Sequence, residues 1–286
     1  MTVIDAHVHL WDPSVRPYRW MADLPRLARR YDSRQLHDAA RGAGVEHALL
    51  VQAASGEAET HELLDVAAAV PWLVVGVIGW VDLTASDVSD RIAALRARLG
   101  GERLVGLRHQ VEDEPTDWLD RPEVRRGLRA VAATGLAFDL LVRPDQIPSA
   151  VRLVDDVDEG RYVLDHGAKP PIGGTGWDSW RTEIGALAQR PHVSVKLSGL
   201  LTQVPHGQPL ALAGPAAGVL LDLFGAERTA FGSDWPVSTL AAPYDQVMAF
   251  THGVIADLDP AEQRAVLGGA ATRVYGLALP PVDGGS

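Results

Sequence analysis

Short apolar runs rich in β-branched residues alternate along the chain with longer amphipathic segments. The amphipathic segments carry apolar residues at three- and four-residue spacings, a pattern that predicts helices, for example over residues 57–69, 87–99, 123–134 and 177–190. The apolar runs predict eight strands, over residues 3–8, 47–52, 73–80, 104–109, 137–142, 162–166, 193–197 and 229–232. Because strands that alternate with helices form parallel sheets, eight such units favour an α/β fold in which the sheet closes into a (β/α)8 barrel.

The alternative fold is an open, doubly wound sheet. Such a sheet usually has a Gly-rich turn after its first strand, whereas here the first strand ends on His7, Val8 and His9. No Ser-, Gly- or charge-rich linker divides the 286 residues. We therefore predict a single barrel domain over residues 1–279, followed by a loose C-terminal tail over 280–286, which is rich in Pro and Gly.

Composition and charge exclude several classes of function. The chain has 26 basic and 37 acidic residues, so its net charge of −11 disfavours nucleic acid as a partner and leaves a small molecule. It has no Cys, so a metal would have to be bound by His, Asp or Glu. The start lacks a basic segment before an apolar stretch, and the longest apolar run, 73–80, is too short to span a membrane. These features predict a cytoplasmic protein without membrane contact; they leave its oligomeric state open.

The position of each His relative to the predicted strands separates candidate site residues from the rest. In a (β/α)8 barrel the active site lies at the C-terminal ends of the strands. Of the ten His, four end a strand: His7, His9, His109 and His166. The others lie in helices, in a loop or at the start of a strand, and we expect them to be structural or solvated: His37, His47, His61, His192, His206 and His252.

A carboxylate completes this group. Asp234 follows the last strand, which neighbours the first strand in a closed barrel. Side chains alternate along a strand, so His7 and His9 point the same way, with Asp5 below them. An Asp before a Pro-containing turn is often only a cap, but its place beside two His favours a chemical role for Asp234.

These motifs, taken in order, resemble the amidohydrolase superfamily, and within it the lactonases that act on sugar acids, including L-fuconolactonases. The resemblance rests on DAHVHLW at 5–11, DHGAKP at 165–170 and GSDWP at 232–236. Further matches are LVQAA at 50–54, VGLRH at 105–109 with DEP at 113–115, YVLDH at 162–166 and KLSG at 196–199. They span nearly the whole chain, so the resemblance concerns the complete fold.

The resemblance implies a distorted barrel of the amidohydrolase type with His7, His9, His166 and Asp234 at its centre. These four are the expected catalytic residues and the expected ligands of a metal. Members with two metals use a bridging Lys and a fifth-strand His, but residues 137–142 read AFDLLV, which disfavours a binuclear site. We expect either one divalent ion, zinc or manganese, or none. The expected substrate contacts come from six further residues: Gln52, Arg108, His109, Lys169, Trp11 and Trp235.

The expected activity is hydrolysis of a sugar-derived lactone, L-fuconolactone or a related aldonolactone, with Asp234 as the general base on water. Arg108 is expected to bind a carbonyl or carboxylate, and Trp11 and Trp235 to form the pocket wall. Strand alternation places His109 opposite Arg108, so both reach the pocket only if the strand bends at its end. Two alternatives remain: a metal-dependent decarboxylase of an unsaturated or aromatic acid, and a catalytically silent barrel that binds a sugar acid.

Overall fold

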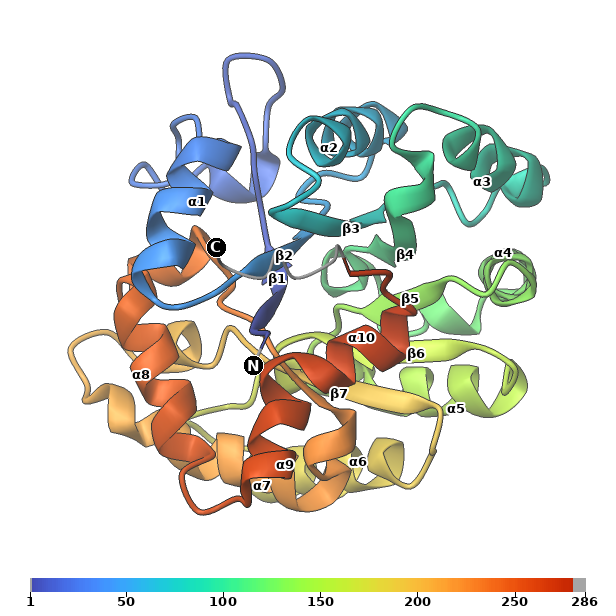
Figure 1. The fold of residues 1–286 in the computed structure, drawn as a ribbon. Helices are drawn as coiled ribbons and strands as arrows, with labels where there is room; N and C mark the ends of the chain where they lie inside the picture. The colour runs from blue at the N-terminus through green and yellow to red at the C-terminus, as the bar shows by residue number, and fades with distance from the viewer. Residues whose placement is uncertain (1, 280–286) are drawn as a thin grey trace.

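Eight parallel strands form one sheet in sequence order, β1 to β8, in the computed structural model, which describes residues 2–279 (Figure 1). The expected tail, 280–286, lies outside the described residues. The predicted (β/α)8 fold is confirmed; two strands have their predicted bounds, and the other six differ by one or two residues at one or both ends. The strands are β1 (Ile4–Val8), β2 (His47–Val51), β3 (Val74–Gly79), β4 (Leu104–His109), β5 (Ala137–Leu140), β6 (Arg161–Leu164), β7 (Val193–Leu197) and β8 (Thr229–Phe231).

Backbone contacts after the last strand close the barrel. Val8 forms an isolated parallel bridge with Trp235, and the backbone N–H of His9 donates to the Trp235 carbonyl at 2.8 Å. The N–H of Asp234 donates to the His7 carbonyl, also at 2.8 Å. This closure carries Asp234 to the side of β1 on which the two histidines lie.

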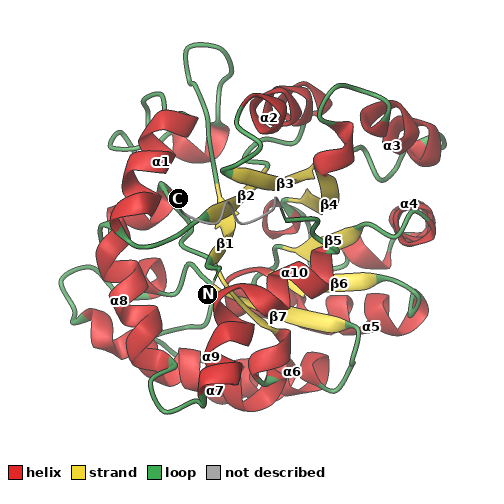
Figure 2. Cartoon of the chain, in the orientation of Figure 1, coloured by secondary structure: helices red, strands yellow, loops and turns green. Residues whose placement is uncertain are grey.

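Helices form the outer ring of the barrel (Figure 2). The predicted helices are confirmed, that over 57–69 with its predicted bounds and the other three with shifted ends. The observed helices are α1 (Ser33–Gly42), α2 (Glu57–Ala69), α3 (Val88–Arg96), α4 (Pro122–Ala133), α5 (Ile147–Asp156), α6 (Trp177–Ala188), α7 (Gly214–Phe224), α8 (Tyr244–Val254), α9 (Pro260–Arg264) and α10 (Ala270–Tyr275). None of the helices in 2–279 combines the length and the apolar character that a membrane crossing requires.

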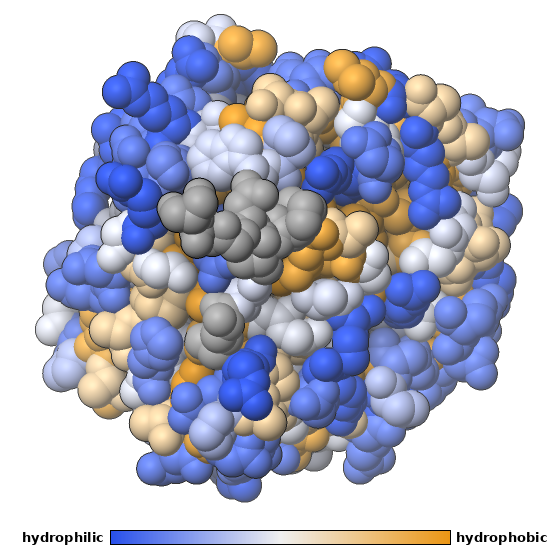
Figure 3. All heavy atoms as spheres, in the orientation of Figure 1, coloured by the Kyte–Doolittle hydropathy of each residue, from blue (hydrophilic) through white to orange (hydrophobic). Residues whose placement is uncertain are grey.

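Strand side chains supply two separate apolar clusters, which explains why the strands read as continuous hydrophobic runs. One cluster lies between the sheet and the helices. The other contains alternate strand residues such as Ile4, Leu49 and Val163, together with Tyr275 of α10. In Figure 1, α10 crosses the end of the barrel at which the strands begin. On that face hydrophobic residues gather toward the middle, and mainly hydrophilic residues surround them (Figure 3).

Strand β6 ends at Leu164, two residues earlier than expected, because the backbone turns there. His166 and Lys169 have φ values of 53° and 54°, and Asp234 has a φ of 57°. This left-handed conformation costs an L-residue about 1–2 kcal/mol. Residues adopt it where surrounding contacts hold them, often at functional sites. Two of the expected catalytic side chains, His166 and Asp234, thus leave the strand direction and turn over the end of the barrel.

Candidate active site

A cavity of about 220 Å³ opens at the end of the barrel where the strands finish. Three of the four expected catalytic residues line it: His9, His166 and Asp234. His7 is fully buried beneath them. The other lining residues are Trp20, Ala53, Arg108, Gln110, Glu112, Leu141, Lys169, Thr202, Gln203 and Val237.

His7, His9 and Asp234 converge at the floor of this cavity. The Nε2 atoms of His7 and His9 are 3.1 Å apart. Asp234 Oδ1 lies 3.5 Å from His9 Nε2 and 3.8 Å from His7 Nε2. Asp5 lies below them, as expected from strand alternation, and its carboxylate accepts from the backbone N–H groups of His7 and Ser233. Asp5 therefore ties β1 to the segment that carries Asp234.

The second nitrogen of each lining histidine is bound by the protein. His9 Nδ1 lies 2.8 Å from the Val51 carbonyl oxygen; because a carbonyl can only accept, Nδ1 carries the hydrogen and Nε2 carries the lone pair. His166 Nδ1 lies 2.9 Å from Ser198 Oγ. These bonds fix both rings in orientation, as such contacts do for histidines that act as ligands or bases.

Two groups of side chains in the described residues have the geometry to hold a metal ion, and they share His7. One consists of His7, His9 and Asp234, and the other of His7, Asp165 and His166. The expected four-ligand set is therefore divided between the two groups. The group with His9 and Asp234 fits a divalent ion, since nitrogen and carboxylate ligands suit zinc or manganese and the lone pair of His9 Nε2 points at the other two side chains.

Burial and neighbouring charges set the protonation states at the cavity floor. Burial lowers the pKa of His9 and of His166 below the ordinary value, so both imidazoles are neutral at pH 7. Burial raises the pKa of Asp234, but His166, His9 and Arg108 lower it further than burial raises it. Asp234 is therefore ionised at pH 7 and available to accept a proton.

Arg108 brings a positive charge to the same floor. Its Nη1 donates to Asp165 Oδ2 at 2.9 Å and lies 3.2 Å from His7 Nε2. Its Nη2 donates to the backbone carbonyl and the side-chain oxygen of Gln52. Gln52 is fully buried and returns a bond from Nε2 to the Arg108 carbonyl at 3.3 Å. Of this expected pair of substrate contacts, Arg108 lines the cavity, whereas Gln52 supports Arg108 from below.

Lys169 reaches the cavity and forms an ion pair with Glu112. Lys169 follows the turn after β6, and Glu112 follows β4, so the pair joins two loops at the mouth. Burial, and to a smaller extent Arg108, lowers the pKa of the Lys169 ammonium group, although Asp234 acts in the opposite direction. The pair places one donor and one acceptor where a polar ligand would enter.

The chain resembles known proteins over almost its whole length. A family model described as "Amidohydrolase" matches residues 4–277. The chain belongs to the amidohydrolase family. It is 34% identical to the L-fucono-1,5-lactonase of Burkholderia ambifaria, over 98% of this chain and 97% of that protein. The solved structure of an amidohydrolase from Burkholderia multivorans with bound zinc has a TM-score of 0.91 and 34% identity; the match covers 97% of this chain and all of that one.

Besides Gln52, three expected substrate contacts of this amidohydrolase lie outside the cavity lining: His109, Trp11 and Trp235. His109 follows the strand alternation of β4 and points away from Arg108. Its Nδ1 accepts from Trp80 Nε1 at 3.0 Å, and its Nε2 donates to Glu114 at 3.1 Å. The strand does not bend at its end, so the expectation that both side chains reach the pocket is corrected.

The two expected tryptophans lie one layer behind the wall. Trp11 donates through Nε1 to the carbonyls of Leu27 and Arg29, and Trp235 meets the ring of Tyr31 edge-on. Trp20 lines the cavity instead and is held by a bond from its Nε1 to the Ala53 carbonyl at 2.8 Å. Trp20 lies in a loop far from any predicted strand end, so the sequence did not indicate it.

Sequence analysis also missed a group of charges beneath the amidohydrolase site. Lys196 of β7 and Asp139 of β5 are fully buried and bonded to each other, and Asp165 lies between Lys196 and Arg108. The available signal was a charged residue within an otherwise apolar strand, in VSVKL at 193–197 and AFDL at 137–140. Such residues are rarely buried without a partner, so these two indicated a buried pair.

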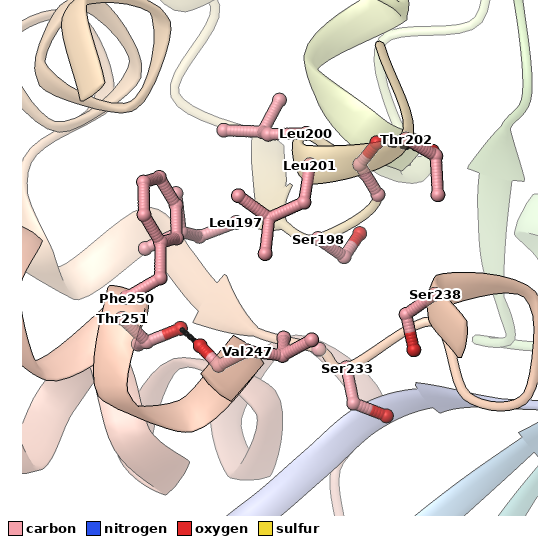
Figure 4. A pocket seen from close by; sticks show the side chains of 12 residues that line it. Leu197, Ser198, Leu200, Leu201, Thr202, Ser233, Ser238, Val247, Phe250 and Thr251 are labelled. Atoms are coloured by element: carbon pink, nitrogen blue, oxygen red, sulfur yellow. Dashed lines mark hydrogen bonds between the residues drawn. The ribbon is translucent and has the colours of Figure 1, made fainter. Parts of the chain in front are cut away.

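A second, smaller pocket lies behind the cavity, between the ends of β7 and β8 and helix α8 (Figure 4). Leucines and Phe250 form one side, and Ser198, Ser233 and Ser238 lie on the other. Its volume of about 10 Å³ is close to the minimum for one water molecule. It contains no carboxylate, amine or imidazole, so it backs His166 through Ser198 and does not form a reaction site.

Proposed function

We propose that this protein hydrolyses the ester bond of a sugar-derived lactone, L-fucono-1,5-lactone or a related aldonolactone, to the hydroxy acid. The observation that carries the proposal is an ionised, buried Asp234 beside two histidines and Arg108 at the floor of a polar cavity. The curated relatives named L-fucono-1,5-lactonase support the substrate class. The cavity volume of about 220 Å³ is below the roughly 300–1,000 Å³ of pockets for drug-sized ligands, and this smaller size suits a single sugar ring.

The reaction needs a base for water and donors for the developing oxyanion. In the proposed mechanism Asp234 takes a proton from water as the water oxygen attacks the lactone carbonyl carbon. The carbonyl oxygen becomes an oxyanion, which Arg108 stabilises as a hydrogen-bond donor. The bond between the carbonyl carbon and the ring oxygen then breaks. Asp234 returns its proton to the leaving ring oxygen, and the product is the open hydroxy acid.

The site also fits a divalent ion, which would bind to residues at the cavity floor. His7, His9 and Asp234 would hold it, and the bound zinc in the Burkholderia multivorans structure supports zinc over manganese. When bound, such an ion acidifies water or polarises a carbonyl. Without it, Asp234 and Arg108 carry out the steps above.

One assay separates the lactonase from the decarboxylase and the silent barrel, because neither alternative opens a lactone. We would measure proton release on addition of a panel of 1,4- and 1,5-aldonolactones, before and after chelation, with the spontaneous ring opening subtracted. Rapid acidification with one sugar series supports the lactonase. If no lactone is opened faster than in buffer, the proposal fails, and release of CO₂ from aromatic acids becomes the next test.

The pH dependence follows from the protonation states. Asp234 has a lowered pKa, so its ionised, reactive form persists as the pH falls toward the ordinary Asp pKa of about 3.9. His9 and His166 have lowered pKa values as well, so they stay neutral below their ordinary pKa of about 6.5. We expect kcat/KM to stay flat between about pH 5 and 8, measured by NMR of ring opening. An acid limb centred near 6.5 would contradict this and indicate a histidine base.

Lys169 is expected to contribute to substrate binding. Lys169→Met removes a donor from the cavity lining, and Glu112, which loses its ion-pair partner, is partly exposed to water, so the fold should persist. We expect KM to rise about tenfold with kcat changed less than threefold, as for the loss of one hydrogen bond of about 1.4 kcal/mol. Initial rates across substrate concentrations measure this. Arg181→Met on the outer surface is the matched control, and an unchanged KM for Lys169→Met would exclude Lys169 from binding.

A further inference from the structure

The buried ammonium group of Lys196 lies directly below the active site. Its Nζ atom is 3.1 Å from His7 Nδ1 and 3.0 Å from Asp165 Oδ1, and it donates to Asp139 Oδ2. All four side chains are fully buried. An ammonium group has three hydrogens and no lone pair, so it can act toward His7 only as a donor.

Asp139 and Tyr275 hold this ammonium group in place. The hydroxyl of Tyr275 donates to Asp139 Oδ1 at 2.8 Å, and Asp139 Oδ2 accepts from Lys196. Tyr275 is the last residue of α10, which covers the end of the barrel opposite the cavity. A continuous set of contacts therefore runs from the C-terminal helix through the barrel to His7.

On its other side His7 faces His9. Because His9 donates from Nδ1 to the Val51 carbonyl, His9 Nε2 carries a lone pair. His7 Nε2 lies 3.1 Å from it, and this contact is a hydrogen bond only when His7 carries its hydrogen on Nε2. His7 then has its lone pair on Nδ1, the atom that faces Lys196.

We propose that Lys196 is a positioning residue that fixes His7 in the tautomer with its hydrogen on Nε2, and that Asp139 and Tyr275 hold Lys196 for this purpose. The opposite tautomer would direct an Nδ1 hydrogen toward the ammonium group and set two lone pairs against each other between His7 and His9.

The two remaining neighbours of His7, Asp165 and Arg108, favour the opposite tautomer, but each has another charged partner. Asp165 Oδ1, 3.3 Å from His7 Nδ1, would accept a hydrogen from Nδ1, yet it makes no hydrogen bond with any described residue. Arg108 Nη1, 3.2 Å from His7 Nε2, favours the opposite tautomer. Arg108 Nη1 already donates to Asp165 Oδ2, so it has a partner in either case. Both opposing groups thus have a charged partner in either tautomer, because Asp165 Oδ1 also lies 3.0 Å from Lys196 Nζ, whereas the contacts of His7 with Lys196 and His9 are favourable only with the hydrogen on Nε2.

The tautomer has two consequences. His7 donates from Nε2 to His9 Nε2 and so orients the His9 ring in the cavity wall beside Asp234, where the proposed function places the reaction; this consequence rests on the proposed function. A metal on His7 Nε2 needs the lone pair of that atom, so Lys196 opposes metal binding. Zinc would bind only when the His7 hydrogen moves to Nδ1, where Asp165 Oδ1 would accept it.

The first test is the ¹⁵N NMR spectrum of the histidine side chains in the full, chelated protein. The nitrogen shifts and their couplings to the ring hydrogens show which nitrogen of each imidazole carries the hydrogen. His7→Gln assigns the signals of His7. We expect Nε2 to be protonated and Nδ1 to be unprotonated in the wild-type protein. A protonated Nδ1 would overturn the proposal, whether or not any variant folds.

The second test removes the cation together with one of its carboxylates. In Lys196→Met with Asp139→Asn, Asp165 keeps its pairing with Arg108. We expect the His7 hydrogen to move to Nδ1 and the zinc Kd, from competition with a chelating dye, to fall at least tenfold. Lys169→Met, which removes a cation that does not touch His7, should leave the tautomer unchanged. A folded double variant with the wild-type tautomer and zinc Kd would refute the role of Lys196.

Both readouts are taken without substrate. Their failure would leave the lactonase assay unaffected, and failure of the lactonase assay would leave the tautomer assignment standing.

Discussion

Asp234→Asn should lower kcat for lactone hydrolysis by about 10²- to 10⁴-fold, the usual contribution of a general base. Asn has nearly the same shape as Asp but cannot accept a proton from water. Asp234 is held by its backbone bond to His7 and by neighbours that already favour the charged form. The expected change is therefore in kcat, with KM altered severalfold at most. Proton release at saturating lactone, corrected for spontaneous opening, measures it.

The control is Asp158→Asn, an exposed carboxylate between α5 and β6 at the far end of the barrel. It should retain wild-type kcat, and circular dichroism should show native secondary structure for both variants. If Asp234→Asn keeps more than about a tenth of the wild-type kcat, another group is the base. Lactone opening that is equally fast in both variants would refute the mechanism and leave the fold assignment standing.

Arg108→Lys should lower kcat/KM by about 10²- to 10³-fold, the scale seen when an oxyanion donor is removed. The substitution keeps the positive charge but loses the planar fork of the guanidinium group. Arg108 bonds both Asp165 and Gln52 while it faces the cavity. A single ammonium group cannot make all of these contacts. We expect the loss to appear mainly in kcat, because the missing interaction strengthens as the oxyanion forms.

Arg34→Lys, on the exposed side of α1, is the matched control and should be neutral. Thermal unfolding of both variants separates a misplaced charge from a damaged fold, since the retained charge still compensates buried Asp165. A loss confined to KM would assign Arg108 to substrate binding alone. Wild-type kinetics in Arg108→Lys would show that charge is sufficient at this position.

Residues at strand ends could be placed from the sequence because the two-residue alternation along a strand determines the face to which each side chain points. The alternation along β1 places His7 and His9 on one face above Asp5, and the same alternation separates Arg108 from His109. The expectation that His109 reaches the pocket failed because it required a bend that β4 does not have. For Trp11 and Trp235 the sequence indicated the correct end of the barrel but not the depth, which depends on how loop side chains pack against one another.

The sequence by itself determined the eight strand and helix units, the end of the barrel that carries the site, and the residue types available for chemistry. These follow from local periodicity and from the absence of Cys. The tertiary structure decided which distant side chains meet: Trp20 from an early loop at the cavity wall, Glu112 beside Lys169, and Tyr275 of the last helix beneath Lys196. Such pairings depend on barrel closure and on loop paths, which bring together residues far apart in the chain. Local periodicity does not predict them.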